Sequence, residues 1–129
     1  MPRRWILRSA RHQRSVSLKI FTAEQSKRSQ EVHILHYLRQ RQLGDKNHFI
    51  VTLLHDFIHK GPNGEHQCMV FELLGPTLAR EVADNNDIFN ETLDPDEVKR
   101  FVLQILYAIE WLHSIGIAHG GKSTLYQSK

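Results

Sequence analysis

The sequence predicts an α+β fold, with an antiparallel sheet in the first part of the chain and helices in the rest. The run Cys68–Phe71 is apolar, too short for a helix and bounded by turn residues, which is typical of a strand buried on both faces. A second largely apolar segment, residues 49–59, precedes the Gly-Pro-Asn-Gly turn at 61–64 and would complete a hairpin. Asp94 followed by Pro95 opens a long segment of helical periodicity and predicts a helix beginning there.

Composition limits the classes of protein that this chain can represent. At 129 residues it corresponds to one domain, and 40% apolar with 24% charged residues is typical of a globular chain rather than a disordered one. No apolar run has the length of a membrane span, so we expect no membrane association. The single cysteine, Cys68, excludes an internal disulfide and fits a reducing compartment.

The N-terminal segment is strongly basic, although the net charge of the whole chain is only +3. An arginine-rich start is compatible with a nucleic-acid-binding arm or with a mitochondrial transit peptide. Two apolar runs, residues 5–7 and 16–21, instead favour two strands joined by a polar connection at 9–15. We therefore interpret the arginines as the solvated edge of a sheet, and nucleic acid is an unlikely partner.

A helix is predicted after the second of these strands. Thr22 and Gln25 have the spacing of a capping box, and Gly44 would end the helix. Glu31 lies at the edge of the apolar stripe of this helix, and a glutamate in that position usually faces solvent. A lysine inside a strand, such as Lys19, ordinarily faces solvent as well. The stripe itself has helical spacing: Val32, Leu35 and Leu38, with Ile34 alongside.

The second half of the chain is predicted to be helical. A short helix is expected at 77–82, a loop at 84–87, and a long helix from Pro95, with Glu97 in its acidic first turn. Six apolar residues of the long helix are expected to form a buried stripe: Val98, Phe101, Val102, Ile105, Ile109 and Leu112.

Four histidines lie close together in the sequence and raise the question of a metal site. These are His48, His55, His59 and His66. No pair has the cysteine or carboxylate company, or the helical spacing, of a zinc motif, so we expect no metal there.

Several motifs together resemble one family. Residues 61–75, GPNGEHQCMVFELLG, closely resemble the fifth strand and hinge of protein kinases, in the version carried by the SR-protein-specific kinases (SRPK) and their fungal relatives. VSLKIF at 16–21 resembles the third kinase strand, SQEVHILHYL the αC helix, and WLHSIGIAH the end of the αE helix. The resemblance covers about residues 5–120 and implies an incomplete kinase fold: residues 5–75 as N-lobe and hinge, 76–120 as the start of the C-lobe, and 121–129 as an unrelated tail.

The resemblance also implies roles for particular residues in binding ATP with Mg²⁺. Lys19 would hold the α- and β-phosphates, and Glu31 would pair with Lys19. Phe71 would be the gatekeeper. The carbonyl of Glu72 would accept a hydrogen bond from the adenine amino group, and the N–H of Leu74 would donate one to the ring.

The catalytic part of the family pattern is incomplete. His119 matches the histidine of the catalytic loop, but Gly121 stands where the family has its catalytic aspartate. The magnesium-binding segments are missing from this chain, and no glycine precedes Gly44, so the glycine-rich loop is either absent or lost upstream of Met1. We therefore expect the chain to be inactive as it stands.

The C-terminal sequence carries two further interpretations. Residues 116–123 match the P-loop pattern G-x-x-x-x-G-K-[ST], but a long helix precedes them and too few residues follow to form the required helix, so we reject a P-loop site. Gly121-Lys122-Ser123 is also what a 5′ splice donor, GGT-AAG-TCN, encodes when it is read through. A read-through would explain both the missing aspartate and the tail, so we expect a truncated product.

The family activity is transfer of the ATP γ-phosphoryl group to serine or threonine of protein substrates, typically Arg/Ser-rich ones, in the cytoplasm or nucleus. The alternative is a non-catalytic, pseudokinase-like module that binds a nucleotide or a partner. Without a complete C-lobe the apolar face of the long helix would stay uncovered, which predicts marginal stability or aggregation.

Overall fold

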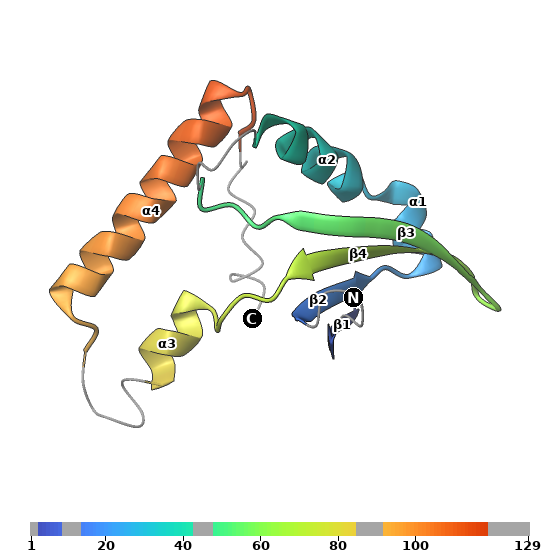
Figure 1. The fold of residues 1–129 in the computed structure, drawn as a ribbon, viewed down its shortest axis with the longest axis horizontal. Helices are drawn as coiled ribbons and strands as arrows, with labels where there is room; N and C mark the ends of the chain where they lie inside the picture. The colour runs from blue at the N-terminus through green and yellow to red at the C-terminus, as the bar shows by residue number, and fades with distance from the viewer. Residues whose placement is uncertain (1–2, 9–13, 43–47, 85–91, 119–129) are drawn as a thin grey trace. The chain divides into compact units, whose positions relative to one another are not determined.

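The computed structural model describes residues 3–8, 14–42, 48–84 and 92–118, and it divides the chain into two compact units. One unit contains the sheet and the first two helices, and the other contains the last two helices (Figure 1). The predicted α+β class is confirmed. Among the described residues, no helix is both long and apolar enough to cross a membrane.

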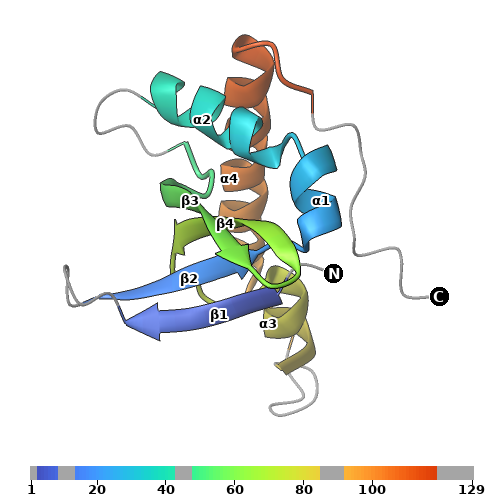
Figure 2. The ribbon, with the colours of Figure 1, turned by 90° about the vertical axis from the view of Figure 1, so that its right-hand side faces the viewer.

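The first unit is built on a four-stranded antiparallel sheet. Its strands are β1 (Arg3–Arg8), β2 (Ser15–Ile20), β3 (Leu53–Gly61) and β4 (Gly64–Glu72), in the spatial order β1-β2-β4-β3 (Figures 1 and 2). The two strands predicted in the basic N-terminal segment are confirmed, and they pair with each other along their whole length.

The hairpin of β3 and β4 differs from the prediction at its start. β3 begins at Leu53, whereas the sequence suggested a strand from Phe49. Phe49 has a positive φ of 56°, which an extended strand does not allow, so the early start was wrong. Pairing continues to Gly61 opposite Gly64, which leaves a two-residue turn.

A bulge near the start of β3 changes which of its side chains project to each face of the sheet. Leu53 pairs with Phe71, but the register then shifts, and Asp56 pairs with Met69. Since Phe71 and Met69 are two residues apart on β4, Leu53 and Asp56 share one face although they are three apart. Leu54 is the extra residue.

The single helix predicted between Thr22 and Gly44 is in fact two. α1 is Ala23–Arg28 and α2 is Glu31–Arg41, separated by an extended Ser29. The hydroxyl of Ser29 accepts a hydrogen bond from the backbone N–H of Glu31 at 3.2 Å. Ser29 thus provides a partner for a backbone N–H in the first turn of α2 that has none within the helix.

The predicted capping box is half formed, and it belongs to α1. Oγ1 of Thr22 accepts from the backbone N–H of Gln25 at 3.2 Å, as a capping residue should. The reciprocal bond is absent, because the side-chain Oε1 of Gln25 is buried without a hydrogen-bond partner. α1 is fastened to β4 instead, where the N–H of Gln67 donates to the hydroxyl of Ser26 at 2.9 Å.

The core of the first unit lies on both faces of the sheet: Leu53, Met69 and Phe71 project to the face that carries α2, and Val16 and Cys68 project to the other face. Its members come from all of these elements except β1 and α1: Val16, Phe21, Leu35, Leu38, Leu53, Cys68, Met69 and Phe71. The predicted buried strand at Cys68–Phe71 is confirmed for three of its four residues, and Val70 is half-buried.

The second unit holds α3 (Leu78–Asp84) and α4 (Pro95–Ser114). The predicted start of the long helix is confirmed: the side chain of Asp94 accepts from the N–H of Asp96 at 3.3 Å, and a proline occupies the first turn. Part of the predicted loop after α3, residues 85–87, lies outside the described residues.

The burial that the helical pattern predicted for the α4 stripe was wrong, and the stripe is largely uncovered, as expected without a complete C-lobe. Val102 and Ile105 are 48% and 51% exposed, Val98 and Ile109 are exposed as well, and Ala108 is the one buried residue of this helix. Phe101 and Leu112 are half-buried. The described part of this unit has no sheet for the stripe to pack against.

Candidate functional site

Lys19 occupies the middle of the sheet on the face that carries α2. In β2 it pairs with Arg4 of β1 on one side and with Met69 of β4 on the other. Its side chain is only 11% exposed, and the residue is the one buried charged residue described. A lysine this buried requires a partner, because burial penalises an unpaired charge strongly.

Glu31 is that partner. The Nζ atom of Lys19 lies 2.6 Å from Oε1 and 2.8 Å from Oε2 of Glu31, so both carboxylate oxygens accept from one ammonium group. The ammonium also lies 4.9 Å from the centre of the Phe21 ring. The ion pair that the family resemblance implies is therefore present in the structure.

The local sequence explains where Glu31 is placed. It is the first residue of α2, where a carboxylate is favoured by the positive end of the helix dipole. Gln30, the residue before it, makes no side-chain cap, so the hydroxyl of Ser29 and the ion pair fix this helix end.

A cavity of about 180 Å³ opens beside the ion pair. Its walls come from β2, from α2 and from the segment that follows β4, and they include Ser17, Glu31, Phe71, Glu72 and Leu74. The structure thus brings together four of the residues predicted for nucleotide binding. Lys19 is not in the cavity wall, but its ammonium bonds the Glu31 carboxylate, which is.

The segment after β4 is exposed, and its backbone is accessible to a ligand. Leu74 is 60% exposed, and among the described residues its backbone N–H takes part in no hydrogen bond. The side chain of Glu72 is held by a backbone group, because its Oε1 accepts a hydrogen bond from the N–H of Thr52 at 3.1 Å. Phe71, which pairs with Ser17 across the strands, closes the cavity on its sheet side.

Relatives of known class match most of this chain. It is 32% identical over 120 residues to protein kinase dsk1 of Schizosaccharomyces pombe, an alignment that covers 89% of this chain and 22% of dsk1. It is 34% identical over 103 residues to the serine/threonine-protein kinase SRPK of Physarum polycephalum, covering 78% and 24%. SRSF protein kinase 3 of Mus musculus is 31% identical over 114 residues, covering 85% and 20%.

The chain is a homologue of the SRPK-type serine/threonine protein kinases. The fold agrees, since a crystal structure of a kinase domain superposes with a TM-score of 0.70 over 88% of this chain and 32% of that one, at 21% identity. No protein-family model matches the chain. It spans about a quarter or less of the curated relatives named above.

The positions that resemble the kinase catalytic loop follow the last described residues, Ile117 and Ala118. His119, Gly120 and Gly121, together with the 121–129 tail, lie outside the described residues. Among the described residues, no group of three histidine, cysteine or acidic side chains is arranged to hold a metal ion.

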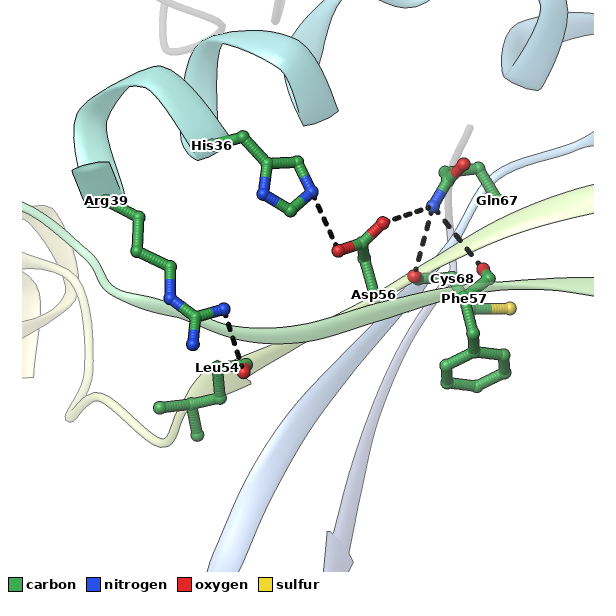
Figure 3. A network of polar contacts seen from close by, with 7 residues as sticks. All are labelled: His36, Arg39, Leu54, Asp56, Phe57, Gln67 and Cys68. Carbon is green, nitrogen blue, oxygen red and sulfur yellow. Dashed lines mark hydrogen bonds and ion pairs between the residues drawn. The ribbon is translucent and has the colours of Figure 1, made fainter.

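The structure reveals a polar network that sequence reasoning missed. Nε2 of His36 on α2 lies 2.8 Å from Oδ1 of Asp56 on β3, and Oδ2 of Asp56 is 3.5 Å from the amide nitrogen of Gln67 (Figure 3). One turn further along α2, Arg39 donates to the carbonyl of Leu54 at 3.3 Å. The available signal was an aspartate between apolar residues of β3, but the face to which Asp56 projects depends on the bulge in that strand.

Proposed function

We propose that the first unit is the nucleotide-binding part of an SRPK-like kinase, and that the whole protein transfers the γ-phosphoryl group of ATP to serine or threonine of protein substrates. The observation that carries the proposal is the part-buried Lys19–Glu31 ion pair beside the cavity that Leu74 helps to line. The kinase homologues support the same reading.

The groups present fit a nucleotide. Lys19 supplies a compact positive charge held in one direction by Glu31, which suits phosphate oxygens. The unbonded N–H of Leu74 and the adjoining Glu72 carbonyl would bind the edge of adenine, and Phe71 would limit the depth of the pocket. Mg²⁺ bound with ATP would neutralise part of the phosphate charge.

We extend the kinase pattern to the domain organisation. Residues 5–75 form the N-lobe and hinge, 76–120 begin the C-lobe, and 121–129 form a tail unrelated to the family. The substrates of the whole protein are proteins, with Arg/Ser-rich segments as the specific expectation, since one relative is named an SRSF protein kinase. We place this activity in the cytoplasm or nucleus.

We further propose that this chain, as written, does not turn over substrate. Gly121 has no side chain that could accept the substrate hydroxyl proton, and loss of a general base alone costs about 10²–10⁴-fold in rate. The same glycine favours the second candidate function, a pseudokinase-like module that binds nucleotide without catalysis.

Isothermal titration of the full chain with ATP and Mg²⁺ tests the proposal. We expect saturable binding that weakens at least about tenfold in Lys19→Ala, because a charge-assisted contact to phosphate is lost. Lys27→Ala is the matched control, since Lys27 is an exposed lysine on α1 and should leave affinity unchanged. ATP binding that is absent in the natural chain, or equal in all three proteins, would contradict nucleotide binding at this site.

A phosphorylation assay with an Arg/Ser-rich peptide tests the proposed inactivity of this chain. The kinase fragment and the binding module both bind ATP, but neither should transfer phosphate with Gly121 in place. Measurable transfer that is lost in Lys19→Ala would contradict the proposed inactivity.

A further inference from the structure

We infer that the contact between His36 and Asp56 is a second clamp on α2, and that it positions Glu31 against Lys19. His36 and Asp56 are thus positioning residues, since both act through Glu31. The inference deepens the proposed function and rests on it, because the Lys19–Glu31 pair is the part that would serve the nucleotide.

The sheet offers two anchor points in one row. Lys19 of β2 pairs with Met69 of β4, and Met69 pairs in turn with Asp56 of β3. Directly paired residues project to the same face, so Lys19 and Asp56 stand on either side of the fully buried Met69. Two strand spacings separate them by about 9–10 Å.

α2 spans that row and is attached at both ends of it. Glu31 bonds Lys19, and five residues later His36 bonds Asp56. A helix rises about 7.5 Å over five residues, which is close to the distance between the two anchors. The spacing of Glu31 and His36 along α2 therefore matches the spacing of Lys19 and Asp56 across the sheet.

The rest of the α2 attachment is modest. The helix has 11 residues, lacks a side-chain N-cap and buries only Leu35 and Leu38. A helix of this length is marginal without tertiary contacts. Arg39, one turn after His36 on α2, adds one bond to the Leu54 carbonyl (Figure 3).

The lever arm explains why the clamp matters for Glu31. Glu31 lies about 7.5 Å along the helix axis from His36. If α2 pivots by about 20° about His36, Glu31 therefore moves by about 2–3 Å. Hydrogen bonds of 2.6 and 2.8 Å do not survive such a shift. The β3 bulge is what turns Asp56 to this face, so the clamp depends on it.

Acetylation of lysines in the full chain with N-hydroxysuccinimidyl acetate, read by peptide mass spectrometry, tests the clamp without nucleotide. The rate at Lys19 is divided by the rate at Lys60, whose side chain is 80% exposed. In His36→Ala we expect this ratio to rise at least about threefold, because Lys19 loses its fixed partner. In His36→Lys, which places a hydrogen-bond donor opposite Asp56 again, the ratio should return to the natural value.

His33→Ala is the matched control, because His33 is an exposed histidine of the same helix and should leave the ratio unchanged. If His36→Ala does not melt cooperatively, Asp56→Asn gives the same comparison while keeping the shape of the side chain. A ratio that stays at the natural value in the folded variant, or rises equally in His33→Ala, would overturn the clamp.

The readout also separates the two proposals. If the ratio responds as expected but the natural chain binds no ATP, the clamp stands and nucleotide binding fails. If ATP binds, we expect its affinity to fall in His36→Ala and to recover in His36→Lys; an ATP affinity equal in all three proteins would contradict a positioning role.

Discussion

The backbone conformation of Gly64 is one that requires glycine. Its φ of +116° lies in a region that other residues rarely adopt, and an added Cβ would approach the Cβ of Ala23 to 3.0 Å. We predict that Gly64→Ala lowers the free energy of unfolding by about 1–3 kcal/mol. Urea denaturation followed by circular dichroism measures this difference.

The partner position in the same hairpin provides the control. At Gly61 an added Cβ would meet the nearest atoms at 3.8 Å, which is ordinary contact, and the backbone there is extended. Gly61→Ala should change stability by less than about 0.5 kcal/mol. Equal losses in the two variants would show that the positive φ of Gly64 has no energetic consequence.

The sequence predicted some site residues better than others at this scale. Lys19 and Glu31 were predicted as a pair because the family motif fixes their spacing, and the structure joins them at 2.6 Å. The His36–Asp56 contact was not foreseen, since simple alternation puts Leu53 and Asp56 on opposite faces of β3. The bulge that reverses this alternation has no signature in the residue pattern.

At the scale of elements, the strands were more predictable than the helix that carries Glu31. Turn residues and apolar runs located β1, β2 and β4 closely, because those signals are local. The break at Ser29 was missed, since the apolar spacing of Val32, Leu35 and Leu38 continues beyond it. α1 packs on β4 whereas α2 packs on β3, and such packing is not visible in periodicity.

The exposed apolar face of α4 leads to a prediction for this element. Ile105 and Leu106 are 51% and 55% exposed, and apolar patches of this kind usually drive association. We expect the chain to form oligomers whose mass rises with concentration in sedimentation velocity. Leu106→Glu should shift the population towards monomer, whereas Lys99→Glu, an exposed charged position on the same helix, should not.

A different result would refute that expectation. A chain that sediments as a monomer at all concentrations and melts in one cooperative transition would mean that the α4 face is covered. The Leu106→Glu substitution would then have no effect on mass.

At the scale of the whole molecule, composition and motifs were sufficient for the fold class and for the family. They could not predict which residues of α4 are buried, because burial depends on neighbours that a single helix pattern does not specify. The described part of the chain contains a four-stranded sheet, α2 and the long helix α4, and its fold matches that of a kinase domain. The proposed activity of the whole protein therefore depends on what its first unit binds.

Affinity labelling with an acyl-phosphate derivative of ATP tests the central claim most directly, because such a reagent acylates a lysine that lies beside the bound phosphates. Our account predicts that mass spectrometry finds the label on Lys19 and that excess ATP suppresses it. The exposed Lys27 and Lys60 should react slowly and without competition by ATP. Labelling of Lys19 that is no faster than at those two lysines, and that ATP does not change, would contradict a nucleotide site at the Lys19–Glu31 pair.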